Sequence, residues 1–250
     1  MDFRIIPVLD LKDGVAVHAV RGERASYAPA RSVLAPSSDP LDLARAFARR
    51  LGCRECYIAD LDAIAHRGNH VGTVRAIAAT GLRVWLDAGA STTGEAQRVL
   101  AEGAARVIIG TETLRDPGEL ERIAAAVDTA PAPGAGRCIL SLDLRGGVLL
   151  GGSPAVQGFD PVTLAATAWE GGIRSFIVLD LGRVGSGGGV DTRTAHRVRQ
   201  ALPDAEIVVG GGVRDGDDLR SLARAGFDGA LVATALHTGA ITSETLTALG

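Results

Sequence analysis

Two short stretches of the chain, VLDLKDG at residues 8–14 and SLDLRGG at residues 141–147, decide the fold. Each stretch continues an apolar run into an aspartate, Asp10 or Asp143, which precedes a basic residue and a glycine. A continuous apolar run bounded by turn-forming residues is typical of a strand that is buried on both faces. We therefore expect both aspartates near the carboxyl ends of buried strands, and the repeated phrase indicates an internal duplication.

Six further apolar runs bring the number of predicted strands to eight. The eight predicted strands cover residues 4–10, 56–62, 83–89, 106–111, 138–144, 175–181, 206–212 and 229–234. The segments between them have helical periodicity; residues 37–52, for example, offer Ser38 or Asp39 as a cap, Pro40 in the first turn and Gly52 as a stop. Strand–helix units with right-handed crossovers predict an α/β fold, a (β/α)8 TIM barrel, with a doubly wound open sheet as the alternative.

The similarity between the two halves extends beyond the opening phrase. YIADLDAIAHRGN at residues 57–69 matches IVLDLGRVGSGGG at residues 177–189, and VWLDAGAS at residues 84–91 matches IVVGGGVR at residues 207–214. We expect a single barrel domain over residues 1–250, made of two fused half-barrels at about 1–130 and 131–250. In that arrangement Asp10 and Asp143 face each other at the carboxyl ends of the strands, where barrels of this type carry their active sites.

Composition excludes several classes of protein. The formal net charge of −3 and the dispersed arginines provide no basic surface for nucleic acid or an anionic membrane. The chain has no apolar run of membrane-spanning length and no leader-like N-terminus, so we expect a cytoplasmic protein. A phosphorylated small molecule is the expected partner, and the sequence leaves a monomer and a homodimer open.

The paired aspartates suggest acid/base chemistry. Two carboxylates in one pocket can divide the roles of acid and base when their surroundings separate their pKa values. The alternative is that each aspartate only caps its own loop through backbone N–H groups. Because Asp10 and Asp143 occupy equivalent, opposed strand ends, we favour the catalytic interpretation.

Glycine-rich turns after the last two strands predict a phosphate site. VVGGGVRDG at residues 208–216 and VATALHTG at residues 232–239 place glycines where backbone N–H groups can approach an anion. The equivalent stretches of the first half are LDAGAST at residues 86–92 and IGTE at residues 109–112. There Asp87 and Ala88 replace the first two glycines, so we expect this phosphate site to be weakened or adapted to a hydroxyl or an amine. The alternative is that Asp87 only caps the next helix.

Other polar features of the sequence can be explained by structural roles alone. Cys53 and Cys56 form a C-x-x-C pair without the second pair that a zinc site needs, so we expect structural thiols and no metal. The glycine-rich segment 185–189 predicts a mobile loop over the pocket, a phosphate nest or a plain linker. His66, His18 and Arg21 stay open as substrate contacts, and we expect His196 and His237 on helices.

The motifs IIPVLDLKDGVAV, ADLDAIAHRGN, RVIIGTETL, SLDLRGG and GGGVRDGDDL, in this order and spacing, resemble the HisA/HisF superfamily of histidine biosynthesis over nearly the whole chain. The resemblance implies an Amadori-type isomerisation of a phosphorylated aminoaldose without a cofactor. Asp143 would protonate the ribose ring oxygen, and Asp10 would take the C2 proton. The implied binding positions, together with Asp87 and Asp180 as further candidates, are Gly211, Gly212, Thr234, Ala235, Gly89, Gly110 and Thr111.

Departures from the family pattern leave alternatives open. The isomerases usually carry three glycines where this chain has residues 87–89, a threonine at Leu179 and Asp-Gly-Thr at residues 184–186. The motifs of this chain are more similar to those of related proteins in methanogens and methylotrophs. This resemblance implies a paralogue in tetrahydromethanopterin-type one-carbon metabolism with a different substrate. A barrel that binds a phosphorylated ligand without turnover is the remaining alternative.

Overall fold

Eight parallel strands form a closed barrel in the computed structural model, which describes residues 3–127 and 136–249. Each strand pairs with the next, and pairing of Arg4 with Gly229 closes the ring. The predicted TIM barrel is confirmed and the open sheet is excluded. In ring order the strands are β1 (Arg4–Lys12), β4 (Glu55–Asp60), β5 (Arg83–Asp87), β6 (Arg106–Gly110), β7 (Cys138–Arg145), β9 (Ser175–Asp180), β10 (Glu206–Gly210) and β11 (Gly229–Val232). The expected boundary between half-barrels, at about residue 130, lies outside the described residues.

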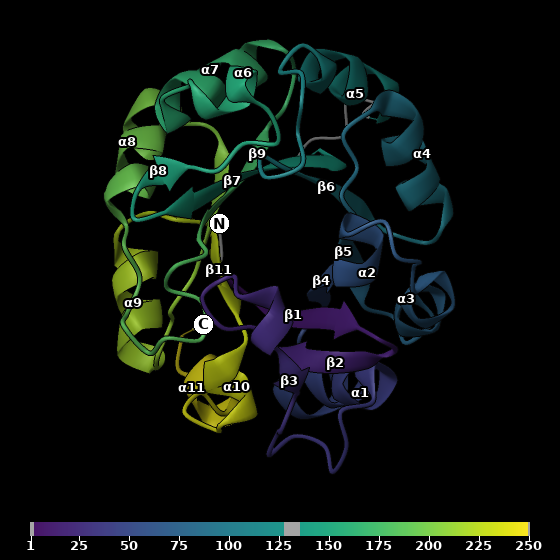
Figure 1. The fold of residues 1–250 in the computed structure, drawn as a ribbon. Coiled ribbons are helices and arrows are strands. Elements are labelled where there is room, and N and C mark those ends of the chain that lie inside the picture. Colours follow the sequence, from purple (N-terminus) through teal and green to yellow (C-terminus); the bar gives the residue numbers. More distant parts are fainter. Residues whose placement is uncertain (1–2, 128–135, 250) are drawn as a thin grey trace.

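Helices form a ring outside the barrel (Figure 1). The first of them begins at the cap Asp39, whose side chain accepts the Asp42 N–H, and ends at the left-handed Gly52. His196 and His237 lie on helices, as expected. The helices are α1 (Pro40–Leu51), α2 (Leu61–Ile64), α3 (Val71–Ala78), α4 (Thr93–Ala101), α5 (Glu119–Val127), α6 (Pro154–Gln157), α7 (Pro161–Glu170), α8 (Arg193–Ala201), α9 (Gly216–Arg224), α10 (Thr234–His237) and α11 (Ser243–Thr247), with a 3-10 turn at Arg24–Ser26. No helix among the described residues is long and apolar enough to cross a membrane.

The repeated phrase folds into the same local structure twice. The strand β2 (Val15–His18) turns back on β1, and β8 (Val148–Leu149) turns back on β7, each after a two-residue loop. Both loops have two successive residues at positive φ, which is the geometry of a tight hairpin turn and explains the Asp-Gly and Gly-Gly dipeptides. These antiparallel extensions, with β3 (Ala28–Pro29), were not predicted because runs of two to four residues carry too little pattern.

Several predicted strands extend too far at their carboxyl ends, and the strand predicted at residues 56–62 is an example. The run at residues 56–62 leaves the sheet after Asp60, and Leu61 and Asp62 belong to α2. The Asp60 carboxylate accepts the Ala63 N–H and so caps this helix at once. The sequence does not reveal this end of the strand, because the buried, apolar Leu61 is compatible with either a strand or a helix.

The barrel interior is filled by large side chains. Trp85, Ile108, Ile139 and Ile177 are buried inside the ring. At the amino ends of the strands, a network of arginines and glutamates closes the floor below Trp85; it consists of Arg4, Glu55, Arg106 and Glu206. A surface groove lined by Arg4, Glu55 and Glu206 also lies at this amino-end face. Barrels of this type carry their active sites at the opposite face, at the carboxyl ends of the strands.

Candidate active site

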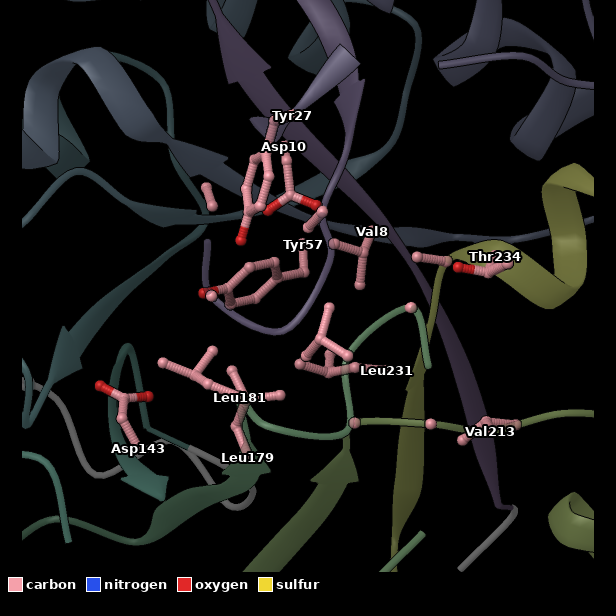
Figure 2. A pocket seen from close by; sticks show the side chains of 18 of the residues that line it. Val8, Asp10, Tyr27, Tyr57, Asp143, Leu179, Leu181, Val213, Leu231 and Thr234 are labelled. Atoms are coloured by element: carbon pink, nitrogen blue, oxygen red, sulfur yellow. The ribbon is translucent and has the colours of Figure 1, made fainter. Parts of the chain in front are cut away.

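A cavity of about 250 Å³ opens at the carboxyl ends of the strands. Asp10 from β1, Asp87 from β5 and Asp143 from β7 all line it. Figure 2 shows Asp143 on one side of this cavity and Thr234 on another, with Tyr57, Leu181 and other apolar side chains between them. The structure therefore brings the two predicted aspartates into one pocket.

Asp143 is held in place by hydrogen bonds at both carboxylate oxygens. The Ser141 hydroxyl donates to Oδ1 at 2.7 Å and the Glu112 N–H donates to Oδ2 at 3.1 Å. The Asp143 backbone N–H donates to the Thr111 hydroxyl at 2.9 Å. A Cβ added to Gly110 would lie 2.9 Å from Asp143 Oδ2, so this carboxylate packs directly on the glycine backbone.

Burial raises the pKa of both predicted catalytic aspartates to about 7. For Asp10 the main cause is desolvation, which the positive charge of Arg24 partly offsets and the negative charge of Asp87 reinforces. For Asp143 desolvation again dominates, and the charge of Asp87 adds to it. Two carboxyl groups whose pKa values are about 7 can each take up or release a proton under physiological conditions.

Asp87 is a third carboxylate of the same pocket. Its Oδ1 accepts the Gly89 N–H at 3.0 Å and its Oδ2 accepts the Tyr57 hydroxyl at 3.2 Å. Desolvation raises the pKa of Asp87 to about 6, although these two hydrogen bonds and Arg24 work against the shift. Desolvation and the aspartates likewise raise the pKa of Tyr57, so the phenol stays protonated and can donate to Asp87.

The other end of the pocket carries the predicted phosphate residues of the second half. Gly211 and Gly212 have φ of +97° and +93°, and both line the cavity with Thr234 and Ala235. Within the described residues, no acceptor is recorded for the Gly211 and Gly212 N–H groups. His18, on β2, lies behind Thr234, with 3.0 Å between His18 Nε2 and Thr234 Oγ1.

Four predicted binding residues lie outside the lining of this cavity. Gly89 packs against Ile64 and lines a separate surface pocket, while Gly110 supports Asp143. Thr111 is fully buried, with its hydroxyl oxygen accepting from Asp143. Asp180 is also buried, and its Oδ1 accepts the N–H groups of Gly146 and Gly182. In this structure these four positions shape the loops around the pocket.

Several lining residues were missed by the sequence reasoning. Arg24, from the turn after β2, lies 2.5 Å from Glu112 across the pocket. Tyr27, Tyr57 and Arg145 also line it. The position of Tyr57 at the start of a segment that is repeated in the second half was the one available signal. Arg24 and Tyr27 come from an irregular segment with no periodicity.

The remaining polar features of the sequence lie away from the carboxylates. His66 is exposed and lines the separate surface pocket that contains Gly89. Burial raises the pKa of the Cys53 thiol to about 11, and among the described residues no cluster of three metal-ligating side chains occurs. In the segment 185–189, Gly185 packs on the Ala19 carbonyl, and the Val184 carbonyl accepts the Arg21 N–H at 2.9 Å. This segment therefore joins the first loop over the pocket.

The fold is a (β/α)8 barrel, and its carboxylate-lined cavity lies at the strand carboxyl ends. The sequence profile of the histidine biosynthesis protein family matches residues 4–242. The chain belongs to this family, and the predicted relation to the HisA/HisF superfamily is confirmed.

Individual relatives cover nearly the whole chain. A Thermus thermophilus protein is 34% identical over 240 residues, which span 95% of this chain and 96% of the relative. A Deinococcus radiodurans protein is 33% identical over 243 residues and 95% of each chain. Both are named 1-(5-phosphoribosyl)-5-((5-phosphoribosylamino)methylideneamino)imidazole-4-carboxamide isomerase, which confirms the prediction of an isomerase.

A relative from a methanogen is similar to the same extent. This Methanocaldococcus jannaschii protein is 31% identical over 241 residues, covers 96% of each chain and is uncharacterized. It gives no support to a role in one-carbon metabolism, and the comparisons give none to a barrel without turnover.

Proposed function

We propose that the protein is a HisA-like isomerase that converts a phosphorylated aminoaldose into an aminoketose, with Asp10 and Asp143 as its acid/base pair. The observation that carries this proposal is the pair itself. Two carboxyl groups from opposed strands share one cavity, and burial raises the pKa of each to about 7. The names of the relatives support the reaction class.

The surroundings of the two aspartates suit different roles. Asp143, hydrogen-bonded at both oxygens, would protonate the ring oxygen and break its bond to C1, which opens the sugar and leaves a Schiff base. Asp10 lines the cavity, and no hydrogen bond to its carboxylate is recorded among the described residues, so it would take the proton from C2. Loss of the C2 proton leaves an enolamine. A proton is then added to C1 and the C2 hydroxyl loses its proton, which gives the ketose with no net change in atoms.

The glycine turn at the far side of the cavity would hold the phosphate. Gly211, Gly212, Thr234 and Ala235 line the cavity, and no acceptor is recorded among the described residues for the two glycine N–H groups. Backbone N–H groups at successive positive-φ residues form concave anion sites. A phosphate fixed there would position the sugar against Asp10 and Asp143.

Conversion of a phosphorylated aminoaldose into its aminoketose tests the proposal. Removal of a positioned acid or base lowers rates by about 10²- to 10⁴-fold, so Asp10→Asn and Asp143→Asn should each lower kcat by that order. Asp204→Asn, an exposed position outside this cavity, is the matched control and should turn over at the wild-type rate. Full activity in both test variants would overturn the catalytic roles.

A further inference from the structure

We propose that Asp87 determines substrate specificity. Its carboxylate accepts the backbone N–H of the turn after β5, which would otherwise be available to bind an anion. The substrate then carries one phosphate, at the glycine turn of residues 211–212. At the Asp87 end it carries a hydrogen-bond donor, an amine or a hydroxyl, in place of a second phosphate. This inference rests on the proposed function, since it assigns the substrate class of the same pocket.

The two equivalent turns differ in what their N–H groups bind. By the sequence match, Asp87 and Gly89 correspond to Gly210 and Gly212. The Gly212 N–H has no recorded acceptor in the described part of the chain, whereas the Gly89 N–H donates to Asp87 Oδ1 at 3.0 Å. A phosphate at the first turn would have to displace a covalently attached carboxylate from the donor that it needs.

The Asp87 side chain is fixed at both oxygens. Tyr57, on the neighbouring strand β4, donates its hydroxyl to Oδ2 at 3.2 Å while Gly89 holds Oδ1. A Cβ added to Gly110 would lie 3.7 Å from Asp87 Oδ2, so the carboxylate also packs on the neighbouring strand end. Because Asp87 lines the cavity, its remaining acceptor capacity is directed at a ligand.

The charges around Asp87 oppose a second phosphate. Asp10, Asp143 and Glu112 line the same cavity as Asp87. Of the arginines that line it, Arg24 is paired with Glu112, and Arg145 follows Asp143 on β7. An added dianion would meet these carboxylates in a partly desolvated site, where like charges repel more strongly than in water. An ammonium or hydroxyl group would instead donate to oxygens that are already in place.

The middle of the pocket separates the two ends. Leu179, Leu181 and Leu231 lie between the carboxylate side and Thr234 in Figure 2. No polar side chain that could hold a sugar hydroxyl is contributed at these three positions. These leucines provide apolar contacts for the substrate body between a phosphate at one end and a hydrogen-bond donor at the other.

Binding of simple phosphates tests the inference without turnover. We would measure, by calorimetry, a series of alkyl phosphates of increasing chain length that end in an amine, a hydroxyl, a methyl group or a second phosphate. The amine or hydroxyl compound should bind about 10-fold more tightly than the methyl compound, as one charge-assisted hydrogen bond provides. The bisphosphate should bind no better than the methyl compound. Tighter binding of the bisphosphate would overturn the inference, and the order of amine and hydroxyl identifies the donor.

Variants of Asp87 separate this inference from the proposed function. Asp87→Gly combined with Ala88→Gly restores a triple glycine and should raise bisphosphate affinity about 10-fold or more, while removing the preference for the amine or hydroxyl. Ala88→Gly alone is the matched control and should keep the wild-type order. An unchanged order in the double variant contradicts the role of Asp87 even if turnover is normal. If Asp10→Asn and Asp143→Asn keep full turnover while the predicted binding order holds, only the proposed function is contradicted.

Discussion

The turn after β5 and the turn after β10 share a sequence origin in our interpretation but differ in the state of their donors. At the β10 turn, Gly211 and Gly212 line the cavity, and their N–H groups have no recorded acceptor among the described residues. At the β5 turn, Asp87 binds the Gly89 N–H and is itself held by Tyr57. The difference teaches that one carboxylate, inserted where a glycine would stand, can convert an anion site into a site for a hydrogen-bond donor.

Gly211→Ala should have the largest effect on this comparison. Gly211 has φ of +97°, and an added Cβ would lie 2.5 Å from the Asp180 carbonyl oxygen, so the turn must move. We expect alkyl phosphate affinity to fall on the order of 100-fold and the free energy of unfolding to fall by about 2–4 kcal/mol. Calorimetry and urea denaturation measure the two quantities.

A control isolates the effect of positive φ. Gly226 has φ of +78°, and its added Cβ would have no neighbour within 4 Å. Gly226→Ala should therefore cost only about 1–2 kcal/mol of backbone strain and leave phosphate affinity unchanged. If Gly211→Ala and Gly226→Ala lose the same phosphate affinity, the close approach at Gly211 has no part in binding.

Gly110→Ala tests the carboxylate side of the comparison. Its new methyl group would approach Asp143 Oδ2 to 2.9 Å and push it away from the Glu112 N–H. We expect kcat to fall roughly 30-fold, because a displacement of about 1 Å at a reacting group has effects of this order. Gly94→Ala, whose added Cβ has open space, serves as the control with wild-type kcat. A rise in KM at constant kcat would contradict a role of Gly110 through Asp143.

Stability against pH measures the cost of the buried carboxylates. The pKa of Asp10 is raised from 3.8 to about 7, so the fold favours its protonated form. Its contribution to stability is fully present below pH 4 and is lost as the pH rises through 7. Asp10→Asn should match the wild type near pH 4 and exceed its free energy of unfolding by about 1–3 kcal/mol at pH 8.

The exposed Asp204 again supplies the control for this titration. Asp204→Asn should follow the wild-type curve of unfolding free energy from pH 4 to pH 8. If the difference between Asp10→Asn and the wild type does not change with pH, then Asp10 titrates normally in the folded protein.

The sequence allowed the barrel to be predicted because eight apolar runs and their helix caps are local patterns. Asp10 and Asp143 could be placed together because strand carboxyl ends meet at one face of such a barrel. The state of the Gly89 N–H could not be predicted, since it depends on contacts among Asp87, Gly89 and Tyr57, which lies thirty positions earlier in the chain. Nor could Arg24, because its segment has no periodicity and is positioned by Glu112 from another loop.

His18 should have the smallest effect among these changes, because it contacts Thr234 and does not line the cavity. When His18 Nε2 donates to Thr234 Oγ1, the threonine hydroxyl proton is directed away from the ring and toward an anion. His18→Ala should therefore weaken alkyl phosphate binding about 3-fold, and His18→Gln, which keeps a donor, should recover most of the loss. His196→Gln, an exposed position on α8, is the control. Equal binding by His18→Ala and the wild type would show that Thr234 orients its hydroxyl without help, and the β10 and β11 turns alone would then account for the phosphate end of the pocket.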